Sequence, residues 1–344
     1  PGFGDDPKAF EKWPRLLSSI SDGSATPILG HGLHEALTGS MRDVAHVLAE
    51  EFHFPLASGD RENLPQVAQF LGTNQDPSML QRSVIQSLWR KVISNYGAEV
   101  GDALYNQKPE TLDWEKLVVE FNTLLEAARQ VRLKRESEEP YALLASVPFR
   151  MYLNTCPDSL LENALKLAGR TPEVAVCEWN DDMRPEPSVF DRDAAYRPDQ
   201  NRPLVYRLFG HLQDPASLVL TEDDYFDYLI GVTSNKDLIP AVVRRALADT
   251  ALIFLGFRMD DWSFRVLFRS IKSQKGGSRR SRYAHVAVQI DPEEGRIIEV
   301  DAARRYFETY FQGSEIAIYW GSVEDFLREL AGQWERRARA KASA

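Results

Sequence analysis

The sequence has little cysteine: Cys156 and Cys177 are the only thiols among its 344 residues. Two thiols are too few for a disulfide framework or for a four-cysteine zinc ribbon. We therefore expect a reducing, cytoplasmic setting. Apolar runs long enough to cross a bilayer are also missing and no signal peptide is visible, so we expect no membrane partner.

Basic residues are fewer than acidic residues, and the formal net charge is −10 at pH 7. An acidic balance disfavours a surface that coats nucleic acid, so we expect no direct nucleic-acid binding. The sequence also lacks the G-x-x-x-x-G-K-S/T pattern of the ATPase phosphate loop. The chain begins with Pro1 rather than methionine, and we expect it to be part of a longer protein.

Short apolar segments alternate with segments of helical periodicity along most of the chain. Residues 251–255 are apolar throughout, which is typical of a central parallel strand buried on both faces. The alternation predicts an α/β fold with a doubly wound, mostly parallel, Rossmann-like sheet. Strands are expected at residues 27–29, 149–153, 174–177, 204–208, 251–255, 285–290 and 315–319.

The segment 63–146 shows helical patterns only, and we expect a helical insertion that lies over the sheet. The other expected parts are an N-terminal helix and linker at 1–22, the α/β domain at 23–330, and a basic tail at 331–344. A basic run ends the last long helix of the insertion, and we expect it to be a solvated helix face. The run consists of Arg129, Arg132, Lys134 and Arg135.

Ligands of doubly wound sheets bind beyond the carboxyl ends of the strands. The first strand ends in Gly30-His31-Gly32, and a single helix is expected to follow over 35–51. Glycines let the backbone come close to a ligand, and a helix N-terminus offers free N–H groups to phosphates. An ordinary tight turn between a strand and a helix is the alternative.

Three later strands end in residues of a similar kind. Their ends carry Asn154-Thr155-Cys156-Pro157-Asp158, Phe209-Gly210-His211, and Gly256-Phe257-Arg258 followed by Asp260-Asp261. The alternative for each one alone is a loop that turns away from a sheet. Together they predict a cleft at the carboxyl edge, fitted to a ligand that bears a pyrophosphate.

Several stretches together resemble the sirtuin-like domains that act as NAD-consuming effectors in bacterial anti-phage systems. The resemblance covers about residues 13–330. It implies an NAD glycohydrolase whose ligand is NAD or an ADP-ribose-type nucleotide, in a homo-oligomer with further domains or subunits. The matching stretches are Leu29-Gly30-x-Gly32, 63–69, Tyr-Leu-Asn-Thr-Cys-Pro-Asp-Ser-Leu-Leu at 152–161, 218–225, 255–265 and 319–326.

The resemblance also implies which residues contact the nucleotide. These residues are Gly30, His31, Gly32, Leu33, Thr155, Cys156, Asp158, Phe209, Gly210, Gly256, Phe257 and Asp261. Two of them depart from the family pattern. Cys156 stands where the family has the Asn that positions the nicotinamide ribose. Phe209 stands where the family has the His that acts on the ribose hydroxyls.

These two departures bear directly on catalysis. Phe cannot transfer a proton, and Cys lacks the geometry of a carboxamide. Losing one positioned acid–base group costs about 10²–10⁴-fold in rate, so little turnover is expected. Side chains two apart in an extended segment share a side. Asn154 and His211 are therefore the candidate catalytic residues of a shifted pocket, or they only hold their own loops.

Three functions stay open at this point. The first is a variant NAD glycohydrolase, and the second is a degenerate module that binds NAD or ADP-ribose without cleaving it. The third is a non-catalytic oligomerisation scaffold with an occluded pocket. His31 and His34 lie close together but lack paired Cys or carboxylate spacing. We expect no metal site, and expect both histidines to flank the ligand loop.

Overall fold

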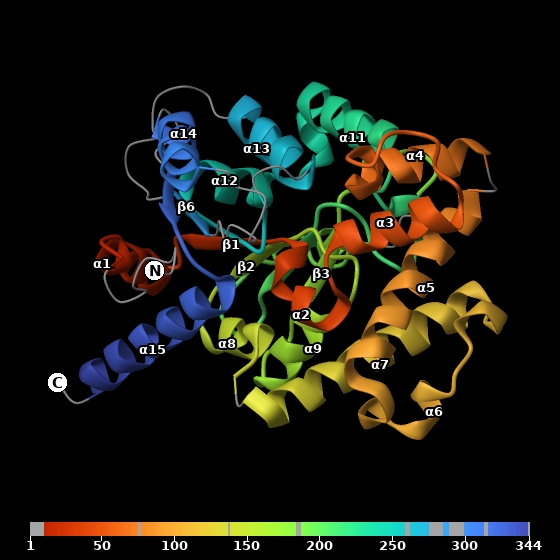
Figure 1. Cartoon of the computed structure of the whole chain (residues 1–344). Helices are drawn as coiled ribbons and strands as arrows, with labels where there is room; N and C mark the ends of the chain where they lie inside the picture. The colour runs from red at the N-terminus through yellow and green to blue at the C-terminus, as the bar shows by residue number, and fades with distance from the viewer. Residues whose placement is uncertain are drawn as a thin grey trace.

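A seven-stranded parallel sheet forms the centre of the molecule (Figure 1), in the order β3-β4-β2-β1-β5-β6-β7. The computed structural model describes residues 10–74, 77–136, 138–183, 187–258, 262–274, 285–288, 299–312 and 316–342. The strands are β1 (Ala25–Leu29), β2 (Met151–Asn154), β3 (Glu173–Val176), β4 (Leu204–Arg207), β5 (Ala251–Leu255), β6 (His285–Val288) and β7 (Ile316–Tyr319). The predicted α/β fold with a doubly wound parallel sheet is confirmed.

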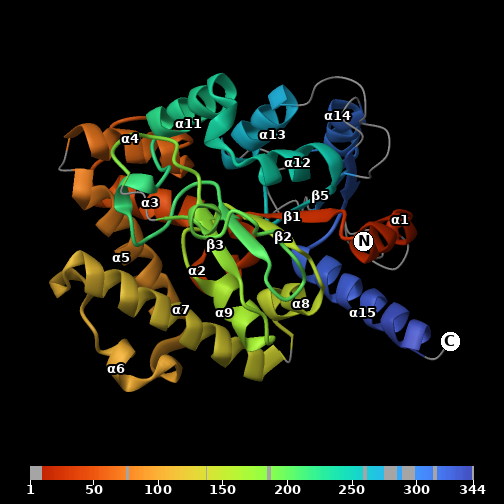
Figure 2. The same ribbon diagram turned by 180° about the vertical axis from the view of Figure 1, so that it is seen from behind.

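Helices cover both faces of this sheet (Figures 1 and 2). One face is covered by α1 (Trp13–Ser21), α8 (Pro140–Ser146), α9 (Leu160–Leu167) and α15 (Val323–Ala342). The opposite face is covered by α11 (Glu222–Ser234), α12 (Ala241–Asp249) and α13 (Trp262–Gln274). The remaining helices of this part are α10 (Val189–Arg192) and α14 (Val300–Gln312).

Strand β5 shows why both faces are covered. Ala251, Ile253 and Leu255 pack into the core on one side of the sheet. Leu252 and Phe254 pack into the core on the other side. Successive side chains of a strand point to opposite faces, so an entirely apolar strand needs two apolar layers around it. The wholly apolar sequence of this segment therefore predicted its central position correctly.

The chain between β1 and β2 is helical. Its helices are α2 (Glu35–Thr38), α3 (Met41–Glu51), α4 (Leu64–Asn74), α5 (Pro77–Tyr96), α6 (Asp102–Tyr105), α7 (Trp114–Glu136) and α8. A small core of its own joins α3, α4 and α5, with Leu48, Val67 and Val84 among its buried members. Two side-chain contacts, between Gln69 and Asp223, tie α4 to the start of α11.

The single helix expected over 35–51 is wrong, because the segment forms two helices. α2 ends at Thr38, and Gly39 follows with a φ of 74°. Only glycine adopts that backbone region without strain, so the helix stops there. Ser40 then begins α3 with a capping box, in which its hydroxyl accepts from the backbone of Asp43.

The expectation that the basic run of α7 is solvated is wrong for two of its four members. Arg129 and Arg132 are only 1% and 4% exposed. Arg129 pairs with Glu126 and Glu139, and Arg132 pairs with Glu136 and with Glu324 of α15. These ion pairs fix α7 against α8 and α15, and periodicity alone does not reveal such partners.

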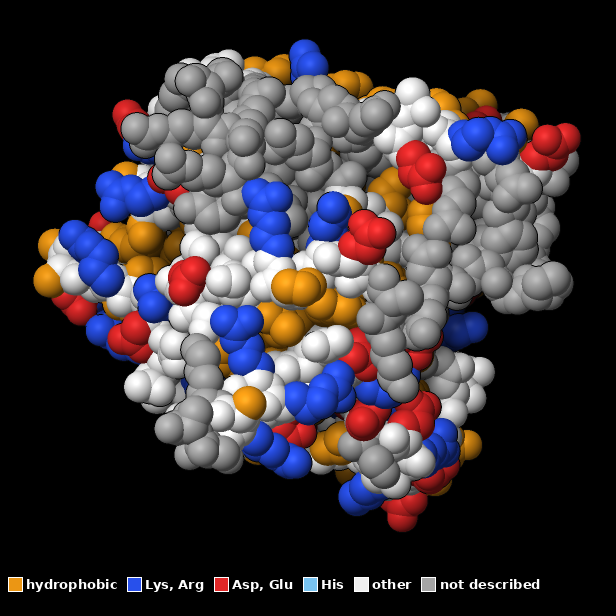
Figure 3. Space-filling view, turned by 90° about the vertical axis from the view of Figure 1, so that its left-hand side faces the viewer, with side chains coloured by type: hydrophobic (Ala, Val, Ile, Leu, Met, Phe, Trp, Pro, Cys, Tyr) orange, Lys and Arg blue, Asp and Glu red, His pale blue; other side chains and the backbone are white. Residues whose placement is uncertain are grey.

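The described surface carries charged side chains of both signs. Figure 3 shows basic and acidic side chains interspersed on the face that carries α1 and α15. None of the helices in the described parts of the chain combines the length and apolarity needed to span a membrane.

Candidate functional site

A cavity of about 310 Å³ lies beyond the carboxyl ends of β1, β2 and β4. This volume is at the lower end of the range of about 300–1,000 Å³ for small-molecule sites. The strand-end loops contribute His31, His34, Thr155, Asp158 and Phe209 to its wall. The helical segment contributes residues of α3, α4, α5 and α7, and α11 and α13 close the opposite side.

The three glycines of the first and fifth strand ends serve a contact between two loops. The N–H groups of Gly30 and Gly32 donate to the carbonyls of Leu255 and Gly256, at 2.7 and 2.9 Å. A Cβ on Gly30 would lie 2.5 Å from the Gly256 oxygen, and Gly256 itself has a φ of 76°. Two of the amides expected to bind phosphate thus already donate to the protein's own backbone.

The helix that follows this turn is also short. Residues 31–33 form one 3₁₀ turn, and α2 has only four residues. A helix of one turn carries little of the macrodipole that attracts anions. The turn therefore offers fewer free N–H groups and a weaker helix dipole to a phosphate than the glycine pattern predicts.

The loop after β2 is held by its own side chains. Thr155 donates both its N–H and its hydroxyl to the Leu29 carbonyl, at 3.0 and 2.8 Å, which fixes it to the end of β1. The side-chain oxygen of Asn154 accepts from the Cys156 N–H at 3.0 Å. Asn154 is 1% exposed and is not among the residues that line the cavity. Its amide therefore shapes the turn.

Arg207, at the end of β4, holds the loop after β2 through hydrogen bonds to its backbone. Its guanidinium donates to the carbonyls of Cys156 and Asp158, at 2.9 and 2.5 Å, and pairs with Glu162 of α9 at 2.6 Å. All of these groups are buried. Sequence analysis missed Arg207, because an arginine at the end of an apolar strand gives no sign of what it will contact.

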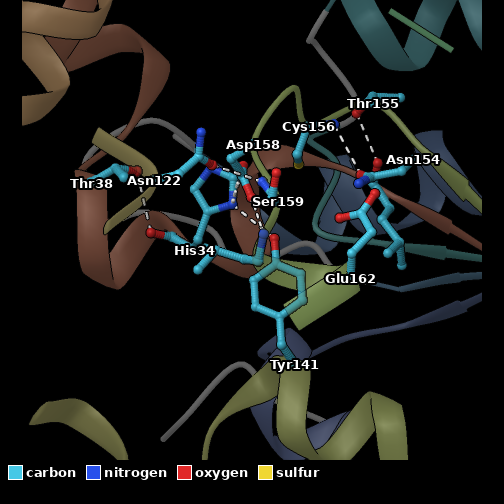
Figure 4. Close-up of polar contacts among 12 residues, drawn as sticks. His34, Thr38, Asn122, Tyr141, Asn154, Thr155, Cys156, Asp158, Ser159 and Glu162 are labelled. Atoms are coloured by element: carbon cyan, nitrogen blue, oxygen red, sulfur yellow. Dashed lines mark hydrogen bonds and ion pairs between the residues drawn. The ribbon is translucent and has the colours of Figure 1, made fainter. Parts of the chain in front are cut away.

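A polar cluster stands beside the loop (Figure 4). The hydroxyl of Tyr141, from α8, lies 2.9 Å from Nδ1 of His34, and a carboxylate oxygen of Asp158 lies 3.8 Å from the same nitrogen. The other oxygen of Asp158 accepts from the Leu160 N–H at the start of α9. Tyr141 was missed, because it is separated from His34 by 107 positions.

Burial favours the neutral forms of His31, His34 and the Cys156 thiol. It lowers the pKa of His31 to about 4, with a further lowering from the neighbouring His34 and an opposing effect of Asp158. Burial also lowers the pKa of His34, against the charges of Asp158 and Glu139. The pKa of the Cys156 thiol is raised, first by burial and then by Asp158.

Phe209 and His211 lie differently with respect to the cavity. The Phe209 ring lines it and packs edge-to-face against Tyr225 and Tyr228, at centroid distances of 5.4 and 4.9 Å. His211 is not among the lining residues, and its N–H donates to the Ser217 hydroxyl in a tight turn. Burial lowers the pKa of His211 to about 2, and the Arg207 charge adds to this effect.

The other nucleotide-binding residues expected from the sequence fall into three groups. Leu33 and Phe257 are buried in the two cores on either side of the sheet. Gly210, with a φ of 88°, allows the turn in which Ser217 approaches the chain closely. Asp261 lies outside the described residues. His31, Thr155, Asp158 and Phe209 are the expected residues that the structure brings to the cavity.

Comparison with known proteins decides the family. Residues 150–319 match the family model of the SIR2-like domain. The chain carries a SIR2-like domain. This finding confirms the sirtuin-like resemblance, and the SIR2-like match includes β2 and β4, whose ends border the site.

Distant relatives of the SIR2-like chain are NAD(+) hydrolases. It is 25% identical over 148 residues to NAD(+) hydrolase ThsA of Enterococcus faecium, covering 43% of this chain and 28% of that protein. It is also 25% identical over 173 residues to NAD(+) hydrolase ThsA of Bacillus cereus (strain MSX-D12), covering 50% and 32%. The chain thus matches at most 32% of the length of these relatives.

Proposed function

We propose that this SIR2-like domain binds NAD or a related ADP-ribose-containing nucleotide in the cavity at the carboxyl edge of the sheet. The observation that carries the proposal is the position of the cavity. It lies where the strand order reverses around β1, with β2 on one side and β5 on the other. Doubly wound sheets bind their ligands at this point. The relatives named NAD(+) hydrolase support the choice of ligand.

The pyrophosphate would be held by side chains rather than by the glycine turn. Arg42 and Arg265 both line the cavity. A guanidinium binds phosphate oxygens through two parallel hydrogen bonds and stays charged at all relevant pH values. Tyr225 and Trp262, whose ring centroids lie 6.2 Å apart, offer aromatic surface on which a base can stack.

Binding without efficient cleavage is the form of the proposal that the geometry favours. Phe209 has no proton to transfer, and its ring is fixed between two tyrosines. Asn154 is engaged in its own turn, and His211 lies off the cavity wall. The two candidate substitutes for the missing groups therefore have structural contacts of their own.

Calorimetric titration with NAD, ADP-ribose and AMP tests this proposal, with liberated nicotinamide measured in parallel. Charge-assisted hydrogen bonds contribute about 1.5–3 kcal/mol. Arg42→Ala and Arg265→Ala should therefore each weaken binding roughly 10- to 100-fold. Arg90→Ala is the matched control, because Arg90 is surface-exposed and pairs with Glu51 away from the cavity wall.

The outcomes separate the three functions that the sequence left open. Binding that is lost in the two cavity variants, with nicotinamide at blank level, supports a binding module. Nicotinamide release at high protein concentration would instead indicate a variant NAD glycohydrolase. Heat signals at the dilution background for all three nucleotides would contradict the proposal and favour a scaffold.

We place the domain in a cytoplasmic homo-oligomer that belongs to a longer, defence-type effector. The proposal follows the resemblance to sirtuin-like effector domains and the similarity to proteins named NAD(+) hydrolase ThsA. Light scattering on the purified chain would measure its mass in solution. A monomer at micromolar concentration would contradict the oligomer.

A further inference from the structure

Three side chains of metal-ligand type meet beside the cavity, and two of them line it. His31, His34 and Cys156 each offer one donor atom, and these atoms all lie within 4.8 Å of one another. The histidines come from the turn after β1 and the cysteine from the loop after β2. Sequence analysis had judged the two histidines to lack a cysteine at ligand spacing, and the tertiary structure supplies it.

We propose that His31, His34 and Cys156 form a binding site for a divalent transition metal, with Zn²⁺ as the preferred ion. One thiolate and two imidazoles are a donor set that selects zinc over magnesium or calcium. The site is separate from the cysteine ribbon that the sequence excludes, since it uses a single thiol.

A buried polar atom without a partner points to a missing ligand. Nδ1 of His31 is buried and makes no hydrogen bond within the described residues. Leaving such a group unpaired costs about 1–3 kcal/mol. A metal ion bound at this nitrogen would satisfy it.

The surroundings of His34 orient it as a metal ligand. Its Nδ1 is engaged by the Tyr141 hydroxyl and faces Asp158 (Figure 4), so a metal ion bound through Nε2 would leave these contacts in place. Metal-binding histidines typically use their second nitrogen in this way, which fixes the ring and raises its basicity.

The distances require only a small adjustment. Zn–N and Zn–S bonds of about 2.0–2.1 and 2.3 Å place tetrahedral donors roughly 3.3–3.6 Å apart. Donors within 4.8 Å reach this arrangement if side-chain torsions move them by about 1 Å. Coordination breaks the Cys156 S–H bond, the proton passes to solvent, and a sulfur lone pair forms the bond to the metal.

Three protein ligands leave the fourth position open. His31 and His34 both line the cavity, so a metal ion held by them would lie beside the space in which the nucleotide is proposed to bind. Zinc sites with three protein ligands commonly hold water or a ligand atom in the fourth position. The metal site stands on its own observations and does not depend on nucleotide binding.

Titration with CoCl₂ under reducing conditions, without nucleotide, tests the site. Co²⁺ reports thiolate ligation through a charge-transfer band in the near ultraviolet. We expect one Co²⁺ per chain with this band, and its displacement by one equivalent of ZnCl₂. The absence of the band in the parent chain would overturn the proposal, whatever the behaviour of any variant.

Variants then identify the ligands. Cys156→Ser and His31→Ala should weaken Zn²⁺ binding by more than about 100-fold, because changes in the surrounding residues alone cost 10- to 100-fold. Tyr141→Phe should weaken it by about 10- to 100-fold with the fold intact. Cys177→Ser is the matched control, since Cys177 is also a buried thiol but belongs to the core on the opposite side.

Two results would contradict this assignment. One is unchanged Zn²⁺ affinity in Cys156→Ser, and the other is an equal loss in Cys177→Ser. Zn²⁺ should also raise the melting temperature of the parent chain but leave that of Cys156→Ser unchanged, which separates ligand loss from unfolding. Because no nucleotide is present, failure of this test leaves nucleotide binding untouched, and the converse also holds.

Discussion

Replacing Arg129 by Met should destabilise the protein far more than its place in a basic helical run predicts. Arg129 donates to both oxygens of Glu126, at 2.7 and 3.0 Å, and to Glu139 at 3.0 Å. The side chains of Arg129 and Glu139 are each 1% exposed. Removing the guanidinium leaves the Glu139 carboxylate buried without its cation. Breaking such a pair costs about 3–5 kcal/mol.

The loss should also reach the candidate site. Glu139 caps α8 by accepting from the backbone N–H groups of Tyr141 and Ala142. α8 carries Tyr141, whose hydroxyl contacts His34. A carboxylate that turns toward water after the loss of Arg129 would release this cap, and caps contribute about 0.5–2 kcal/mol. The two effects share Glu139, so they should not simply add.

Urea unfolding followed by circular dichroism and tryptophan fluorescence measures the effect. Lys134→Met is the matched control, because Lys134 belongs to the same run but is exposed. Exposed substitutions of this kind change the free energy of unfolding by about 0.5 kcal/mol or less. Equal losses of unfolding free energy in Arg129→Met and Lys134→Met would refute the reasoning. They would show that the buried ion pair does not contribute more to stability than an exposed lysine.

Three further predictions follow from particular residues. Phe209→Ala should cost about 3–5 kcal/mol in urea unfolding, because it removes a ring packed between two tyrosines; a loss under 1 kcal/mol would contradict that packing. Gly256→Ala should destabilise much more than Gly169→Ala, since both have positive φ but only Gly256 meets backbone atoms at 2.7 Å; similar melting temperatures would refute this. The pKa of His211 is lowered to about 2, so the unfolded chain, with its higher pKa of about 6.5, takes up the proton first. Stability is therefore fully present above about pH 6.5 and is lost as the pH falls, and His211→Gln should flatten the stability curve between pH 7 and 5; parallel curves would speak against it.

The candidate site could be located from the sequence, but its internal contacts could not. Strand ends with glycine, asparagine and histidine pointed to the edge of the sheet at which the cavity lies, and His31, Thr155, Asp158 and Phe209 line this cavity. The sequence could not show that the Gly30 and Gly32 amides are engaged by the fifth strand's loop. A glycine pattern indicates that another group comes close to the backbone. It does not indicate whether this group is a ligand or another part of the chain.

The sequence by itself determined the α/β class, the central position of residues 251–255 and the sirtuin-like family, because periodicity and motif spacing are local properties of the chain. Only the tertiary structure decided that Tyr141 meets His34 across 107 positions and that Arg132 meets Glu324 across 192. It also brought Cys156 to the two histidines. Side-chain partners depend on how distant elements pack, and no local pattern encodes that packing.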